Sequence, residues 1–233
     1  MLNVRKSETR GRAEHGWLSS RHTFSFASYH DPRHMGIGPL RVINEDKVQP
    51  GEGFGTHAHR DMEIISYVLG GALEHKDSMG TGSVLHYGDV QRMSAGSGVT
   101  HSEFNHSSSE PVHFLQIWVM PEHASIEPSY EEKYFDADSK RNQLRLIASP
   151  GGENGSLRLH QDARLYASIL DGEVRLQQPL AEGRIGYVQV ARGSLSVNGQ
   201  VLSAGDAMQI IGEPEIVLAD ARDAEVLVFD LPK

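Results

Sequence analysis

The stretch HAHRDMEIISYVLGG, residues His57–Gly71, places two histidines one residue apart and a carboxylate, Glu63, four residues after His59. Side chains alternate along a β-strand, so residues 57, 59, 61 and 63 are expected on one face. With 13 histidines in the chain, a His-x-His pair alone is a weak signal. Glycines at 51 and 70 flank the pair and Glu63 at fixed spacing, and this context predicts a metal site in a β-fold rather than surface polarity before a strand.

A second stretch, GVTHSEFN, supplies further donors of the same kind. His101, Glu103 and Asn105 alternate in it and are expected on one strand face. Together with His57 and His59, these residues offer three imidazoles and a carboxylate. Such a nitrogen- and oxygen-rich set suits Fe, Mn, Ni, Cu or Zn and leaves positions open for water or substrate.

Short alternating or apolar runs recur along the chain with Gly, Asp or Asn between them, which is typical of antiparallel strands and turns. Sustained helical periodicity is absent, and Glu127–Gln143 is read as a loop with one helical turn and as the linker. A Gly-Asp pair follows a strand and turn in each half, at residues 88–89 and 205–206. We therefore predict an all-β fold of two stacked antiparallel β-barrels of the jelly-roll type, residues 1–135 and 136–233.

Composition narrows the function. The formal net charge of −9, without a basic run, argues against nucleic-acid binding and an anionic membrane surface. The chain has no cysteine, so disulfides and thiolate ligands are excluded and any metal must bind histidine and carboxylate. No apolar run approaches the roughly 18 residues of a membrane span, and the cytoplasm is the expected location.

The residues also resemble a known family. The spacing G(x5)HxH(x3)E(x6)G from Gly51 to Gly70 resembles the first cupin motif, and Gly98–Asn105 resembles the end of the second. Ser94-Ala95-Gly96 departs from the Pro-x-Gly that usually precedes it. Across about residues 3–121, the segments HGWLSSRHTFSFASYHDPRHMG, HKDSMG, MSAGSGVTHSEFN and LQIWVMP are similar to pirins, and closest to bacterial pirin-like quercetin 2,3-dioxygenases.

This resemblance implies a bicupin with a single metal site in the N-terminal barrel and a C-terminal barrel that lacks metal ligands. Carried over by position, the ligands are His57, His59, His101 and Glu103. Ordinary cupins would use Glu63 as the fourth ligand instead. We expect Glu103 to be the ligand and Glu63 the catalytic base, with Glu103 as the reserve base.

The implied activity is dioxygenation of a flavonol such as quercetin by O2, with opening of the heterocycle and release of carbon monoxide. The implied cofactor is one divalent transition metal, with Fe(II) favoured and Ni, Cu, Mn, Co or Zn as alternatives. A second hypothesis is a pirin-like regulator that binds a protein partner according to its metal or redox state, with incidental quercetinase activity. A third is a cupin isomerase or hydrolase that uses Zn or Mn as a Lewis acid.

The remaining conspicuous side chains have simpler interpretations. His22 is expected to pack or hydrogen-bond rather than bind metal. Three further histidines beside aspartates are expected in loops: His30, His34 and His75. Four apolar residues could line an aromatic-accepting pocket, although plain core is favoured: Phe54, Met62, Met93 and Met120.

Overall fold

The computed structural model describes residues 1–233 and is almost entirely β-structure. Its one α-helix, α1 (Ala137–Lys140), is a single turn capped by Asp136, whose side chain accepts a hydrogen bond from the Ser139 N–H at 2.8 Å. No helix is long and apolar enough to cross a membrane. The all-β prediction is confirmed.

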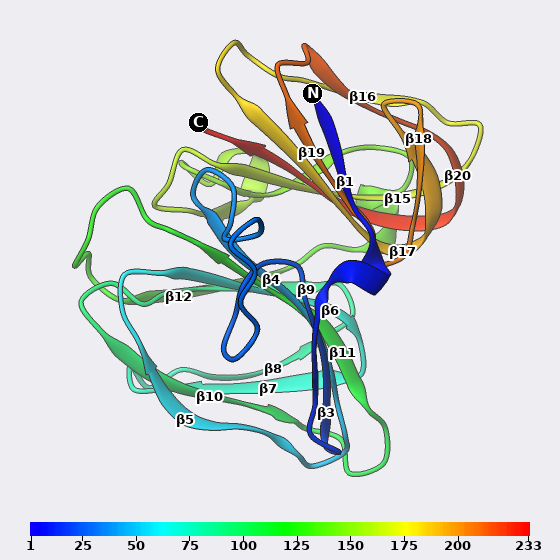
Figure 1. The fold of residues 1–233 in the computed structure, drawn as a ribbon. Coiled ribbons are helices and arrows are strands. Elements are labelled where there is room, and N and C mark those ends of the chain that lie inside the picture. The colour runs from blue at the N-terminus through cyan, green and yellow to red at the C-terminus, as the bar shows by residue number, and fades with distance from the viewer. The chain divides into compact units, whose positions relative to one another are not determined.

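The chain forms two compact units. We call Gly11–Tyr134 with Leu157–Gln161 the N-terminal unit, and Met1–Arg10, Phe135–Ser156 and Asp162–Lys233 the C-terminal unit. The main division falls inside the predicted linker. The first ten residues nevertheless belong to the C-terminal unit, because β1 (Leu2–Arg5) pairs with β19 (Ala207–Ile211), as the blue and orange strands of Figure 1 show.

The N-terminal unit contains two sheets that face each other (Figure 1). The larger sheet has the strand order β12-β9-β6-β11-β4-β3-β2. Its strands are β2 (Gly11–Glu14), β3 (Leu18–His22), β4 (Leu40–Val48), β6 (Glu63–Gly70), β9 (Asp89–Ser94), β11 (Val112–Val119) and β12 (Ser129–Tyr134). The smaller sheet, in the order β5-β10-β7-β8, contains β5 (Gly53–His59), β7 (Ala72–Asp77), β8 (Gly82–His86) and β10 (Val99–Asn105).

Apolar residues from both sheets fill the space between them. One cluster joins Val68 and Phe114 of the larger sheet to Leu73 and Leu85 of the smaller one. Gly71 closes the hairpin between β6 and β7 with φ +77°, and a Cβ there would lie 2.5 Å from the Pro111 carbonyl oxygen. The sheets form a jelly-roll sandwich, which is consistent with the jelly-roll type of β-barrel predicted from the sequence.

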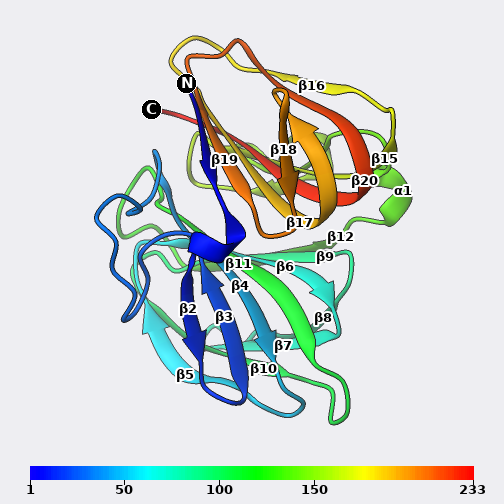
Figure 2. The ribbon, with the colours of Figure 1, turned by 45° about the vertical axis from the view of Figure 1, so that its right-hand side comes forward.

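The C-terminal unit is built on two long strands, β17 (Ile185–Val197) and β20 (Glu215–Leu231). They pair with each other, and Figure 2 shows β18 beside β17. A single apolar cluster that includes Val188, Val190, Val226 and Val228 forms its core. The remaining elements are the 3-10 helices η1 (Ser7–Thr9) and η2 (Glu153–Gly155) and the strands β13 (Arg145–Ser149), β15 (Arg164–Gly172), β16 (Leu176–Pro179) and β18 (Gln200–Ser203). Strand β14 (Leu157–Arg158) lies in the short segment that belongs to the N-terminal unit.

One sequence prediction about strands was wrong. Residues 129–134, read as part of a loop, form β12, which pairs with β9 at the edge of the larger sheet. Their mostly polar side chains suit an edge strand with one face exposed to solvent. A sequence of this kind is hard to distinguish from a loop.

Candidate metal centre

Two neighbouring strands bring three imidazoles together. His57 on β5 lies directly across from His101 on β10 in the antiparallel register, and His59 is two residues further along β5. Ring centroids are 4.6 Å apart for His57 and His101, 4.7 Å for His57 and His59, and 4.8 Å for His59 and His101. We call His57, His59 and His101 the histidine triad; their ligand nitrogens lie within 4.8 Å of one another.

The hydrogen bonds of the triad suit a cation. His57 Nδ1 lies 2.8 Å from the Gly55 carbonyl oxygen, which assigns the ring proton to Nδ1 and leaves a lone pair on Nε2. That Nε2 lies 3.2 Å from His101 Nε2, so without metal one proton must lie between the two nitrogens. A divalent transition metal can take its place, since imidazole nitrogen ligates such ions through the same lone pairs. The donor set therefore fits the metal implied by the sequence.

Burial lowers the pKa of two of the three rings. Burial and the neighbouring His57 lower the pKa of His59 to about 4. Burial, with the three nearby imidazoles, lowers the pKa of His101 still further. A neutral imidazole is the form that binds a metal, so His59 and His101 stay available as ligands below pH 7.

Glu103 projects from β10 between the sheets and is held there by three side chains of the larger sheet. Gln116 Nε2 donates to Oε2 at 2.6 Å, while Ser66 Oγ and Gln91 Nε2 donate to Oε1 at 3.1 and 3.2 Å. Burial raises the pKa of Glu103 to about 7, although these hydrogen bonds act to lower it. Only 1% of Glu103 is exposed, which makes its carboxylate a fixed part of the interior.

The three donors to Glu103 belong to a continuous line of polar residues across the larger sheet. Residues that face each other on adjacent antiparallel strands project to the same side. Register pairs His22 with Asn44, Asn44 with Gln116, Gln116 with Ser66, and Ser66 with Gln91. We call this set the polar row. Apolar pairs lie next to it on the same face, such as Trp118 with Ile64, so the row marks a polar strip through an apolar interior.

Glu63 does not share a strand face with His57, contrary to the sequence prediction, while its role as catalytic base stays a prediction. β5 ends at His59, the chain turns through Asp61 at φ +51°, and Glu63 is the first residue of β6. The alternation that starts at His57 is therefore interrupted before Glu63. Ser66, three residues along β6, faces Glu103, so Glu63 projects to the opposite side of the strand. There its Oε2 accepts from the backbone N–H of His160 and lies 3.2 Å from His160 Nδ1.

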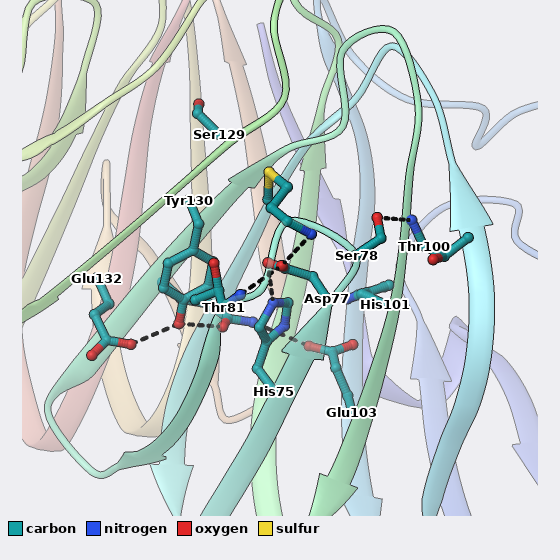
Figure 3. Close-up of polar contacts among 12 residues, drawn as sticks. His75, Asp77, Ser78, Thr81, Thr100, His101, Glu103, Ser129, Tyr130 and Glu132 are labelled. Atoms are coloured by element: carbon teal, nitrogen blue, oxygen red, sulfur yellow. Dashed lines mark hydrogen bonds and ion pairs between the residues drawn. The ribbon is translucent and has the colours of Figure 1, made fainter.

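The sequence interpretation missed His75. Rather than lying in a loop, it is on β7, fully buried, with its ring centroid 5.4 Å from that of His101 and stacked on Tyr130 at 4.9 Å. Its Nε2 lies 3.0 Å from Asp77 Oδ2, and Figure 3 shows the ring between Tyr130 and Glu103. The alternation of His75 and Asp77 before the turn at residues 78–81 was the available signal, because residues two apart on a strand share a face.

His75, His101 and Glu103 form a second group whose ligand atoms lie within 4.8 Å of one another. His101 is thus shared between this group and the histidine triad. Glu103 is near His101, as the alternation along β10 predicted, but it is not in the triad group itself. Its assignment as the fourth ligand stays a prediction.

A cavity of about 490 Å³ opens beside His57, His59 and Glu103. Two edge-to-face aromatic pairs contribute to its walls: Trp17 with Phe54 at 5.4 Å and Phe26 with Trp118 at 5.3 Å. The polar lining residues lie on β3 and β4 (Ser20, His22, Asn44 and Asp46) and around the triad (His57, His59, Glu103 and Gln116), with His15 at one side. Such a mainly apolar cavity with several fixed polar groups is typical of a site for a small aromatic molecule.

The other predicted residues fall into four groups. His22 is buried beside Phe26 and contributes to the cavity wall, whereas His30 and His34 lie in loops as expected. Phe54 lines the cavity. Met93 is core and Met62 packs against the same cluster, while Met120 is 40% exposed.

Comparison with known proteins agrees with this architecture. Residues 3–119 match the pirin family model, and residues 146–231 match the quercetinase C-terminal cupin domain. A quercetin 2,3-dioxygenase of Escherichia coli K12 is 48% identical over 233 residues, which span 100% of this chain and 99% of that protein. A putative quercetin 2,3-dioxygenase of Pasteurella multocida is 42% identical over 235 residues, 99% of this chain and 100% of that protein.

Solved structures give the same result. The crystal structure of YhhW from Escherichia coli has a TM-score of 0.96 and 48% identity, and the match covers 100% of this chain and 98% of that one. The structure of the bacterial pirin YhhW in complex with nickel(II) has a TM-score of 0.95 and 46% identity, with 100% and 99% covered. By its sequence and its two cupin units, this chain belongs to the pirin family of the cupin superfamily.

Proposed function

We propose that the protein is a metal-dependent dioxygenase that opens the heterocycle of flavonols such as quercetin and releases carbon monoxide. The observation that carries this proposal is the histidine triad at the edge of an aromatic-lined cavity of about 490 Å³. Full-length relatives carry the name quercetin 2,3-dioxygenase, which supports the same substrate class.

In this proposal His57, His59 and His101 hold one divalent transition metal, Fe(II) by preference, with Glu103 completing the ligand set. Such an ion would polarise adjacent hydroxyl and carbonyl oxygens of the substrate and supply redox chemistry toward O2. Iron is a proposal based on the resemblance. Nickel(II) is the ion named for the related E. coli structure.

The protein's own residues supply orientation and proton transfer. Trp17, Phe54 and Trp118 offer ring faces and edges along the cavity, which would hold a planar substrate and exclude water. Of the two carboxyl groups in the cavity, Glu103 is the one grouped with His101, so we assign to it the proton of the flavonol 3-hydroxyl. A carboxylate has about four acceptor positions, and three hydrogen bonds fill three of them on Glu103. In this proposal the metal and the proton would use the remaining position in turn.

The test combines metal analysis with turnover. Protein purified without chelator is assayed for bound metal, then for oxygen consumption and carbon monoxide release with quercetin. The wild type and a His106→Ala control should bind about one metal and turn over, since His106 bonds Glu74 outside the triad. His101→Ala should lose both. Quercetin turnover by metal-free protein, or by His101→Ala, would refute the proposal.

The same experiment addresses the regulator hypothesis. A pirin-like regulator would bind metal and change its affinity for a protein partner between Fe(II) and Fe(III), yet consume no oxygen with quercetin. Metal binding by the triad without turnover would therefore favour that alternative over the dioxygenase.

A further inference from the structure

The polar row contains more than the holders of Glu103. Gln116, Ser66 and Gln91 bond that carboxylate, but the row continues past Gln116 to Asn44 on β4. Asp46 lies two residues further along β4 and therefore on the same face. Both Asn44 and Asp46 line the cavity that adjoins the histidine triad.

These two residues carry buried acceptors that the protein leaves unpaired. Asn44 is 2% exposed and Asp46 is 3% exposed, and the Oδ1 atom of each lacks a hydrogen-bond partner, although the Ser20 hydroxyl lies beside the Asp46 carboxyl. Buried polar atoms are hydrogen-bonded in the great majority of cases, so two unpaired oxygens on one strand face of a cavity indicate a missing partner. That partner must bring hydrogen-bond donors.

The rest of the cavity selects the kind of donor. The walls formed by Trp17, Phe54 and Trp118 favour a planar aromatic molecule. Asp46 and Glu103 lie in the same cavity and would oppose a ligand that carries its own carboxylate. A phenolic hydroxyl satisfies both requirements, because it is attached to an aromatic ring and donates to a carboxyl or an amide oxygen.

We propose that Asn44 and Asp46 bind ring hydroxyl groups of the substrate, distinct from the 3-hydroxyl assigned to the metal side, and so select hydroxylated flavonols over bare ones. The proposal rests on the proposed function for the identity of the aromatic ligand. It adds which substituents the cavity recognises and which residues recognise them.

The test compares two probes that share the 3-hydroxyl: quercetin, with four further ring hydroxyls, and 3-hydroxyflavone, with none. Binding to the nickel-loaded protein under anaerobic conditions is followed by tryptophan fluorescence, since Trp17 and Trp118 are the two tryptophans and both line the cavity. Asn44→Leu and Asp46→Leu remove the acceptors at similar side-chain size. Glu45→Gln is the matched control, because Glu45 lies between them on β4 and bonds His113 at 3.0 Å.

Wild type and Glu45→Gln should bind quercetin at least about tenfold more tightly than 3-hydroxyflavone. Each Leu variant should weaken quercetin binding by about tenfold and leave 3-hydroxyflavone binding within about twofold. Asp46→Asn retains an acceptor oxygen and should recover most of the quercetin affinity. A wild type that binds both probes equally would overturn the proposal even if the variants fail to fold, and so would Leu variants that weaken both probes alike.

The outcomes separate this proposal from the dioxygenase itself. Turnover of quercetin without any dependence on Asn44 or Asp46 would overturn the recognition proposal alone. Selective binding that depends on Asp46, without oxygen consumption, would support recognition and refute the dioxygenase. Failure of the wild type to bind either probe would overturn both.

Discussion

Glu63→Gln separates the two roles open to this carboxylate. A base for the flavonol hydroxyl would have to reach the cavity, but Glu63 faces the other side of β6 and bonds His160. We therefore expect the substitution to change stability and to leave quercetin turnover within about twofold of wild type. The expectation follows from strand geometry, since one position along a strand reverses the direction of a side chain.

The size of the stability effect follows from the contacts. Glu63 Oε2 lies 3.2 Å from both the His160 N–H and the His160 Nδ1, and glutamine can keep one such acceptor bond. A hydrogen bond to a charged group contributes about 1.5–3 kcal/mol and a neutral one about 0.5–1.5 kcal/mol. Glu63→Gln should therefore cost about 1 kcal/mol in the free energy of unfolding, which lowers Tm by about 2–4 °C for a chain of this size.

The assay pairs thermal unfolding with oxygen consumption on metal-loaded protein. His160→Ala removes one of the two partners, so Glu63→Gln and His160→Ala should be less than additive in a double-mutant cycle. A loss of about 100-fold in kcat with unchanged metal content and unchanged Tm would show that Glu63 is the base after all. The assignment from strand geometry would then be wrong.

Three further perturbations test other parts of the structure. Saturating nickel(II), at about 100 times its Kd, should stabilise the wild type by about 2.7 kcal/mol, measured as a rise in Tm, and His101→Ala should show no rise. Burial acts to raise the pKa of Asp77, but hydrogen bonds from His75 and the Thr81 and Met79 N–H groups outweigh it and lower the pKa. The ionised Asp77 side chain therefore contributes fully to the free energy of unfolding above the ordinary aspartate pKa of about 4, and this contribution is lost as pH falls through the lower pKa of the folded state. Urea unfolding between pH 6 and pH 2 should show that acid lowers the free energy of unfolding less in Asp77→Asn than in wild type. Gly71→Ala should destabilise the protein by at least about 1 kcal/mol in urea unfolding, because φ is +77° and the added Cβ would meet the Pro111 carbonyl at 2.5 Å; an unchanged midpoint would contradict that geometry.

Strand alternation predicted much of the metal centre. His57 and His59 are separated by one residue on β5, and His101 and Glu103 by one residue on β10, so each pair shares a face wherever its strand lies. The pairing of β5 with β10 could not be derived from periodicity, because it depends on long-range register. The expectation that these two strands meet at one site came from the resemblance to cupins. In the structure, β5 pairs with β10 and His57 lies opposite His101.

The failures arise where a strand ends. Glu63 was assigned to the face of His57 by extending one strand through residues 57–63, yet Asp61 adopts a positive φ and the next strand begins at Glu63. Aspartate tolerates this conformation better than most residues, and a turn of this kind leaves little trace in composition. His75 was lost for the converse reason: Asp77 suggested a turn, although the strand continues through it.

These two errors have a common consequence for how the cavity is understood. Glu63 points away from the cavity and His75 points between the two sheets. The polar side chains next to His101 therefore include Glu103, the residues that hold it and the His75–Asp77 pair. The cavity wall then continues along β4 to Asn44 and Asp46, whose unpaired oxygens have no role in holding the triad. The larger sheet thus divides its polar residues between fixing one carboxylate and offering acceptors to a ligand, and recognition of the substrate should be separable by mutation from metal binding.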